Sequence, residues 1–150
     1  RLTEAGRTVI VITNQSAVGR GMMDAATLEG MHRNLCREAA AHGGRIAAVL
    51  HCPHHPEAGC SCRKPEPGLI RQARRRFALD LAAAAMIGDS ARDVQCGKRA
   101  GCGRTILVRS GLHDHLPRLA SRGLAPDWVA DDLAAAVEWL LAQPLGASGR

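Results

Sequence analysis

A chain of 150 residues, 46% hydrophobic and 23% charged, has the length and composition of one globular domain, which excludes an intrinsically disordered protein. No apolar stretch approaches the roughly 18 residues of a membrane-spanning helix, so we expect no membrane partner. The net charge of +6 could serve nucleic acid or a small polyanion. With no Tyr, one Phe and two Trp, the chain has few aromatic side chains on which bases could stack, and it has no recognised nucleic-acid-binding motif, so we expect no nucleic-acid partner.

Strand and helix patterns alternate along the chain. Short apolar or β-branched runs predict strands over residues 8–13, 46–51, 84–88, 105–109 and 127–130. Capping residues and apolar periodicity predict helices over residues 25–42, 67–77, 91–100 and 133–141. The run at 8–13 lacks polar alternation, so we expect that strand to be covered on both faces. The pattern predicts an α/β fold, with a Rossmann-like three-layer α/β/α domain over residues 1–143, a parallel sheet, and a flexible tail at 144–150.

The strongest local motif is the loop C-P-H-H-P-E-A-G-C-S-C, which begins at residue 52. Its ligand types and spacing can close a tetrahedron around zinc through Cys52, His54, Cys60 and Cys62. Four protein ligands leave no open position, so we predict a structural Zn²⁺ site. A disulfide and a set of incidental thiols are the alternatives, although a Cys60–Cys62 disulfide would close a strained small ring. Cysteines used in this way indicate a reducing compartment, hence the cytoplasm.

A second motif follows the first predicted strand, where T-N-Q-S leads into a glycine-bearing loop that contains Arg20. The Thr13 hydroxyl and the backbone N–H groups of such a loop can hold phosphate oxygens. Asn and Ser after a strand are also common turn formers, so the motif alone is a weak signal.

Two further motifs lie at predicted loop and strand ends. Arg63 and Lys64 directly follow the zinc ligands, where two adjacent cations are ordinarily solvated surface. Asp89 and Asp93 follow a buried strand and suit a hard cation such as Mg²⁺, although capping of the next helix by Ser90 and Asp93 is an equal alternative. Active sites of parallel sheets lie outside the carboxyl ends of the strands, so we expect these motifs to act together.

Taken in order, the motifs resemble the pattern of the haloacid dehalogenase (HAD) superfamily after its first motif. Thr13 falls at the second-motif hydroxyl, Lys64 at the third-motif lysine, and Asp89 with Asp93 at the fourth-motif acids. The zinc loop that runs into C-R-K-P resembles the branch of heptose 1,7-bisphosphate phosphatases and bacterial histidinol phosphatases. The stretches T-N-Q-S-A-V-G-R-G and K-P-E-P-G are similar to the heptose enzymes.

The resemblance implies a phosphomonoester hydrolase that removes the C7 phosphate of D-glycero-D-manno-heptose 1,7-bisphosphate in lipopolysaccharide precursor synthesis, through an aspartyl-phosphate. Thr13 and Lys64 would stabilise the transferring phosphoryl group, and Asp89, supported by Asp93, would hold Mg²⁺. The implied substrate-binding residues are Asn14, Gln15, Ser16, Arg20, Arg63 and Ser90. Histidinol phosphatase is the alternative activity. The expected partner is a phosphorylated sugar, and we expect a monomer.

The family's first motif, a strand ending in D-x-D, precedes the second-motif strand. Residues 1–7 contain no such sequence. The chain is therefore expected to be a fragment, the product of a late start, or a catalytically inactive, zinc-stabilised phosphate-binding module, and as it stands it should lack turnover. In the superfamily the D-x-D strand lies between the strands that end here at Thr13 and Asp89, so its loss would expose strand edges.

Overall fold

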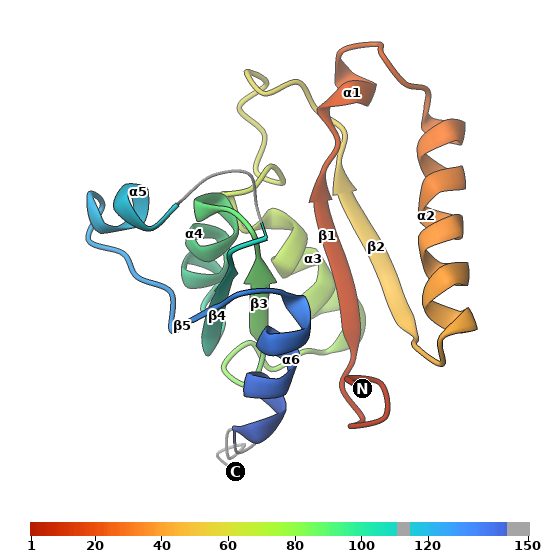
Figure 1. Ribbon diagram of the computed structural model, residues 1–150. Helices are drawn as coiled ribbons and strands as arrows, with labels where there is room; N and C mark the ends of the chain where they lie inside the picture. The colour runs from red at the N-terminus through yellow and green to blue at the C-terminus, as the bar shows by residue number, and fades with distance from the viewer. Residues whose placement is uncertain (111–114, 144–150) are drawn as a thin grey trace. The chain divides into compact units, whose positions relative to one another are not determined.

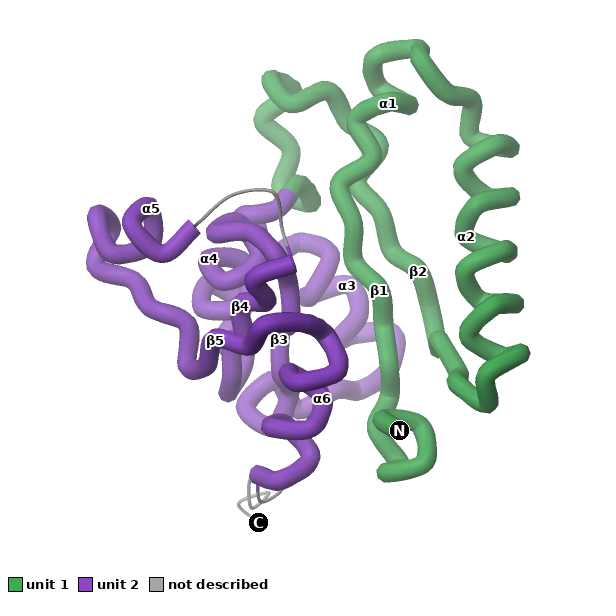
Figure 2. Tube along the Cα trace, in the orientation of Figure 1, with its two compact units in different colours: residues 1–63 green, residues 64–150 purple. Residues whose placement is uncertain are grey.

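The computed structural model describes residues 1–110 and 115–143, through which strands and helices alternate (Figure 1). The chain forms two compact units, residues 1–63 and residues 64–150, which Figure 2 distinguishes by colour. The tail predicted at 144–150 lies outside the described residues, and the single domain predicted over 1–143 stays a prediction.

The first unit is a parallel pair of strands with a long helix beside it. Strand β1 (Val9–Asn14) pairs with β2 (Ile46–Cys52) in a register that sets Thr13 against His51 and Asn14 against Cys52. Helix α2 (Ala25–Ala41) begins as predicted, because the Asp24 carboxylate accepts a hydrogen bond from the Thr27 N–H at 2.6 Å. The parallel register brings the carboxyl ends of both strands to one edge.

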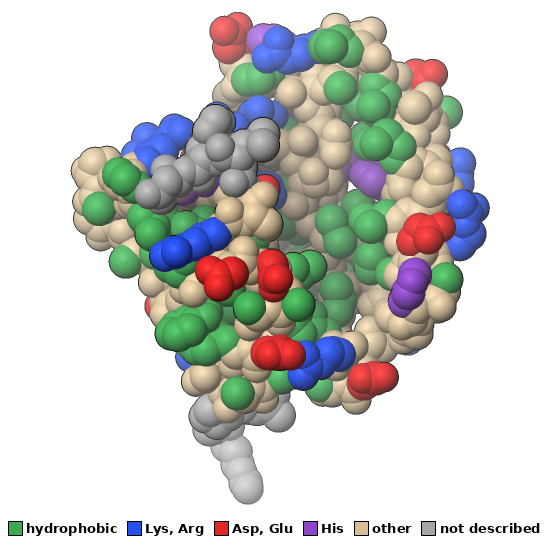
Figure 3. Space-filling model, in the orientation of Figure 1, with side chains coloured by type: hydrophobic (Ala, Val, Ile, Leu, Met, Phe, Trp, Pro, Cys, Tyr) green, Lys and Arg blue, Asp and Glu red, His purple; other side chains and the backbone are tan. Residues whose placement is uncertain are grey.

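The two sides of α2 differ, as expected for a helix that covers a sheet. Leu28 is fully buried, and α2 contacts β2. The outer side carries exposed charges of both signs, among them Glu29 and Arg33, and mixed charge is visible along this helix in Figure 3. This side is therefore an ordinary solvated surface.

Two features of the first unit differ from the sequence prediction. A short helix, α1 (Ser16–Gly19), forms where a loop was expected. Strand β1 is half-buried along its whole length, so the prediction that both its faces are covered is too strong. Among the described residues β1 pairs only with β2, which leaves its other edge without a neighbouring strand.

The second unit is a parallel sheet in the order β3-β4-β5, with strands Ala85–Gly88, Arg104–Val108 and Trp128–Ala130. Its helices are α3 (Gly68–Phe77), α4 (Ala91–Ala100), α5 (Leu116–Ala120) and α6 (Leu133–Ala142). The apolar core lies on both faces of the sheet: Leu107 packs with Val94 and Leu119, and Ile106 packs with Ala136. The prediction of an α/β fold with parallel strands is confirmed.

The arginines of α3 at positions 71, 74, 75 and 76 are exposed, so this helix face is solvated. Within the described residues, no helix combines the length and the apolar character required to cross a bilayer.

Candidate functional site

The four predicted zinc ligands come together at the carboxyl end of β2 and in the loop after it. Their ligand atoms all lie within 4.8 Å of one another. The Cys52 Sγ lies 3.5 Å from both His54 Nδ1 and Cys60 Sγ, the Cys60 and Cys62 sulfurs are 3.6 Å apart, and His54 Nδ1 is 3.2 Å from Cys62 Sγ. For a tetrahedron around zinc, ordinary Zn–S and Zn–N bonds require S···S edges of about 3.8 Å and N···S edges of about 3.6 Å. The residues present therefore fit zinc.

The same distances exclude the disulfide alternative for these thiols. A disulfide requires sulfurs about 2.05 Å apart, far closer than the separations found here, and all six cysteines are free. The neighbouring His51 and His55 do not belong to the ligand cluster.

Two of the three thiols in the cluster, Cys60 and Cys62, have pKa values shifted in opposite directions. Burial opposes ionisation of Cys60, but hydrogen bonds from Cys52, Cys62 and the backbone outweigh it and lower the pKa of this thiol to about 7. Burial, with the neighbouring sulfurs Cys52 and Cys60, raises the pKa of Cys62 to about 12. A second thiolate is thus disfavoured next to the first, and a bound cation would supply the missing compensation.

The predicted phosphate-binding residues of the first unit are connected to the zinc loop. The Gln15 backbone N–H donates to the carbonyl of the ligand Cys52 at 2.8 Å. The Gln15 side-chain amide donates to the Thr13 hydroxyl oxygen at 3.2 Å. A hydroxyl that accepts this bond keeps its own proton for another acceptor. Gln15 therefore orients Thr13, a role that the sequence did not indicate.

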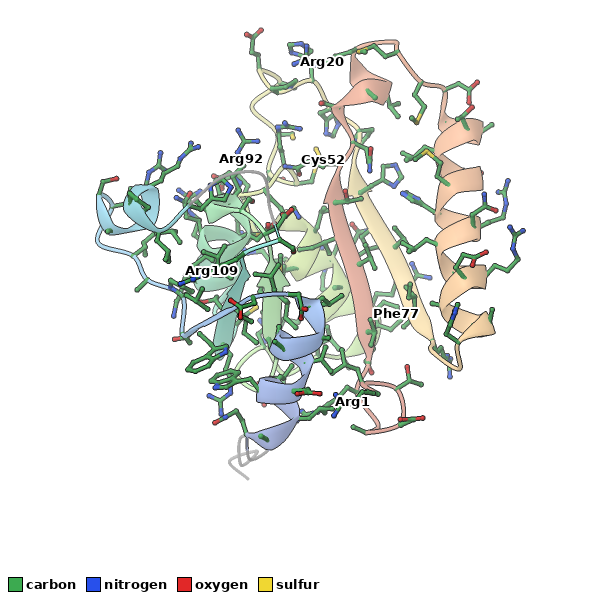
Figure 4. The ribbon with its side chains drawn as sticks, viewed as in Figure 1. Arg1, Arg20, Cys52, Phe77, Arg92 and Arg109 are labelled. Carbon is green, nitrogen blue, oxygen red and sulfur yellow. The ribbon has the colours of Figure 1, made fainter. Side chains whose placement is uncertain are left out.

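The loop after β1 continues into α1 and turns back beside the zinc loop. Ser16 is the first residue of α1, and Arg20, at its carboxyl end, is exposed. Figure 4 labels Arg20 and Cys52, which lie at the same end of β1 and β2. Gly19 packs against the backbone of Pro53–His55 so closely that a Cβ atom there would lie 2.5 Å from the His55 nitrogen.

In the second unit, the predicted third and fourth motifs are joined by a buried ion pair. Lys64 Nζ lies 2.7 Å from Asp93 Oδ1, and their side chains are 15% and 5% exposed. The other oxygen of Asp93 accepts hydrogen bonds from the Ser90 hydroxyl at 2.8 Å and the Ser90 N–H at 3.0 Å. Asp93 thus stabilises the first turn of α4 and holds Lys64 at the carboxyl end of β3. Of the two alternatives for Asp93, the capping contact with Ser90 is present, and the role at a Mg²⁺ site stays a prediction.

Further contacts, which the sequence did not reveal, anchor the segment after Lys64 on α4. Glu66 forms an ion pair with Arg99, and its carbonyl accepts a hydrogen bond from the Cys96 thiol at 3.4 Å. Burial raises the pKa of Cys96 to about 12, so this thiol stays protonated as a donor. These partners are about 30 residues apart in sequence, so no local pattern could have indicated them.

Two predicted site residues, Asp89 and Arg63, have charged-group atoms that make no hydrogen bond with the described residues. Asp89 directly follows β3, is exposed, and makes no hydrogen bond or ion pair with another described residue. Arg63 Nη1 is buried without a hydrogen-bond partner among residues 1–110 and 115–143. A buried guanidinium nitrogen in this state is expected to have an anionic acceptor, because an unpaired polar atom is costly.

Comparison with known proteins gives consistent results. The HAD-hydrolase-like family model matches residues 61–136. D-glycero-beta-D-manno-heptose-1,7-bisphosphate 7-phosphatase of Bordetella bronchiseptica is 45% identical over 142 residues, 94% of this chain and 78% of that protein. The enzyme of the same name from Pseudomonas putida is 37% identical, covering 94% and 79%. The crystal structure of the B. bronchiseptica D,D-heptose 1,7-bisphosphate phosphatase, complexed with magnesium and phosphate, superimposes with a TM-score of 0.84 at 45% identity, again over 94% and 78% of the two chains.

Proposed function

The chain belongs to the HAD-like hydrolase family, and from that premise we propose that it removes the 7-phosphate of D-glycero-D-manno-heptose 1,7-bisphosphate. The relatives described above carry this activity in their names. The structural observation that carries the proposal is the buried Lys64–Asp93 pair, which fixes an ammonium group beside the carboxyl end of β3. A cation held there can stabilise the negative charge of a phosphoryl group.

Lys64 and Thr13 would act directly on the phosphoryl group. Lys64, held in place by Asp93, would donate hydrogen bonds to phosphoryl oxygens. Thr13 donates its hydroxyl proton, because its oxygen already accepts a bond from Gln15. Both interactions strengthen as charge develops, which is the requirement for lowering the barrier. The attacking carboxylate and the general acid would come from the D-x-D motif of the family's pattern.

Asp89 is the residue best suited to hold Mg²⁺. Its carboxylate is exposed and uncommitted among the described residues, whereas both oxygens of Asp93 are occupied by Lys64 and Ser90. Carboxylate oxygens are the ligands Mg²⁺ prefers, so the donor set fits. When bound, the ion would neutralise phosphoryl charge. Asp93 supports the site indirectly, through Lys64 and Ser90.

The remaining site residues would recognise the rest of the substrate. The unpaired Nη1 of Arg63 supports a contact with the second phosphate or the sugar. Polar substrate contacts are expected at the strand ends and in the segments that follow them. The site residues found there are Asn14, Ser16, Arg20 and Ser90. Zinc, held by the Cys52 cluster, would be structural and would fix the loop that leads into Arg63 and Lys64.

The proposed compartment is a reducing one. All six cysteines are free, which supports the cytoplasm as the compartment. We also propose that the protein acts as a monomer on a phosphorylated sugar in lipopolysaccharide precursor synthesis.

The test is the identity of the product. The 150 residues are joined to a segment carrying the family's D-x-D motif, loaded with zinc, and incubated with the heptose bisphosphate and Mg²⁺. Phosphorus NMR should then show loss of the 7-phosphate signal and retention of the 1-phosphate. Loss of the 1-phosphate would contradict the proposed regiochemistry. A folded, zinc-loaded protein that binds phosphate but releases none would instead indicate a binding module.

A further inference from the structure

At Gly19, the backbone of the segment that carries Ser16 and Arg20 lies directly against the backbone of the zinc loop. An ideal Cβ on Gly19 would lie 2.5 Å from the His55 nitrogen, 2.6 Å from the Pro53 oxygen and 2.8 Å from the His54 carbonyl carbon. Real Cβ atoms do not approach backbone atoms this closely. A side chain at Gly19 is therefore incompatible with the present seating of α1 on residues 53–55.

The position does not require glycine for its own conformation. Gly19 lies in the helical turn α1 and is not among the residues with positive φ. Alanine would suit such a backbone. Among the described residues, the close approach to the zinc loop is what accounts for glycine at this position.

The backbone that Gly19 touches also carries a zinc ligand. His54 must hold its Nδ1 within the sulfur cluster, 3.2 Å from Cys62 Sγ, so its backbone has little freedom when the metal is bound. A second link runs in parallel, from the Gln15 N–H to the carbonyl of the ligand Cys52 at 2.8 Å. Both ends of the turn, Gln15 and Gly19, therefore contact the backbone of residues in the zinc loop that are, or adjoin, the predicted zinc ligands.

We propose that Gly19 is a positioning residue through which the zinc site holds the α1 turn, and with it Ser16 and Arg20, in place. Zinc then supports the loop after β1 as well as the one that contains its ligands. Because coupling between two events is reciprocal, seating of the turn must in return strengthen zinc binding. The proposal rests on the proposed function only for the roles of Ser16 and Arg20, and its test requires no catalysis.

The test compares Gly19→Ala with Gly30→Ala in the 150-residue chain. Both glycines are helical. Apart from its chain neighbours and the backbone of its own helix, a Cβ at Gly30 would meet among the described residues only the Arg33 Nη2, at 3.8 Å, so that variant should be harmless or stabilising. Zinc affinity is measured by competition with a chromophoric chelator. We expect about tenfold weaker binding in Gly19→Ala and no loss in Gly30→Ala. Equal zinc affinity in wild type and Gly19→Ala would overturn the proposal.

Amide hydrogen exchange provides the second measurement and keeps the test decisive if Gly19→Ala folds poorly. Removing zinc from the wild-type chain should speed exchange at residues 16–22 as well as at 53–62, with α2 as the internal reference. In Gly19→Ala the amides at 16–22 should exchange quickly even with zinc bound, and chelation should add little there. Unchanged protection of residues 16–22 after zinc removal from the wild-type chain would contradict the coupling.

Discussion

At the scale of single residues, spacing predicted the metal-ligand cluster but not which polar side chains hydrogen-bond to one another. Cys52, His54, Cys60 and Cys62 were identified because ligand geometry restricts their spacing within one loop, and they do cluster. The hydrogen bond from Gln15 to Thr13 was not predicted. The sequence suggested a substrate contact for Gln15, and side-chain direction within a T-N-Q-S turn has no signature in the sequence.

The buried pair of Lys64 and Asp93 leads to a prediction with a matched control. Lys64 and Lys98 are the two lysines of the chain, and each binds an aspartate at 2.7 Å. In the protein that carries the D-x-D segment, Lys64→Met should lower kcat by about 100-fold or more, because the phosphoryl group loses a fixed cation. Lys98→Met should lower Tm and leave kcat unchanged. Steady-state kinetics and thermal unfolding distinguish the two, and an unaltered kcat in Lys64→Met would refute the role of this lysine.

At the scale of elements, the long periodic segments were predictable and the shortest ones were not. Each predicted strand is found within one or two residues, and α2 begins at its predicted cap, Asp24. The helices α1 and α5 were missed, because segments of four and five residues are too short for apolar periodicity to develop. Tertiary contacts such as the seating of Gly19 stabilise elements of this size.

The zinc loop is the element that spacing predicted most fully, and its metal content can be measured directly. Protein purified without added metal should contain one zinc per chain by elemental analysis. Replacing both Cys60 and Cys62 with Ser should abolish that zinc. The control replaces Cys36 and Cys102, two free cysteines outside the ligand cluster, with Ser and should retain it. Zinc content near zero in the unaltered chain, or equal content in both variants, would rule out the site.

A second element-scale prediction concerns Asp127, which fastens the start of β5 to β4 and α4. Its carboxylate accepts hydrogen bonds from the Thr105 N–H at 2.6 Å and the Thr105 hydroxyl at 2.9 Å, and Lys98 Nζ contacts both its oxygens. Burial opposes ionisation, but these bonds outweigh it and hold the pKa of Asp127 below its usual 3.8. The associated stability is therefore present above the unfolded-state pKa and is lost as the pH falls through the folded-state pKa.

Asp127→Asn should accordingly cost about 1 kcal/mol of unfolding free energy at neutral pH, a modest figure because the carboxylate is partly exposed. The difference from wild type should shrink as the pH falls below about 4, where the wild-type carboxyl becomes protonated as well. Urea unfolding across this pH range measures it, with Asp131→Asn as a control for simple removal of an exposed charge. A difference in unfolding free energy between wild type and Asp127→Asn that stays constant with pH would mean that the Asp127 charge contributes nothing to stability.

At the scale of the whole molecule, the α/β class followed from the alternation of elements, and the family from the order of the motifs. The division into units around residues 63 and 64 did not follow, because no linker composition marks it. The sheets also carry strands with one open edge: among the described residues, β1 pairs only with β2 and β3 only with β4. Such edges bind a further strand readily.

The active protein is expected to prefer a sugar bisphosphate to an amino-alcohol phosphate. This preference is given by the ratio of kcat/KM for D-glycero-D-manno-heptose 1,7-bisphosphate to that for histidinol phosphate. It is measured in Mg²⁺ buffer on the zinc-loaded chain joined to the D-x-D segment, with the 150 residues alone as the control. Histidinol phosphate lacks the second phosphate that Arg63 is proposed to contact, so we predict a ratio of about 100 or more. Comparable values for the two substrates, or a preference for histidinol phosphate, would contradict the assignment.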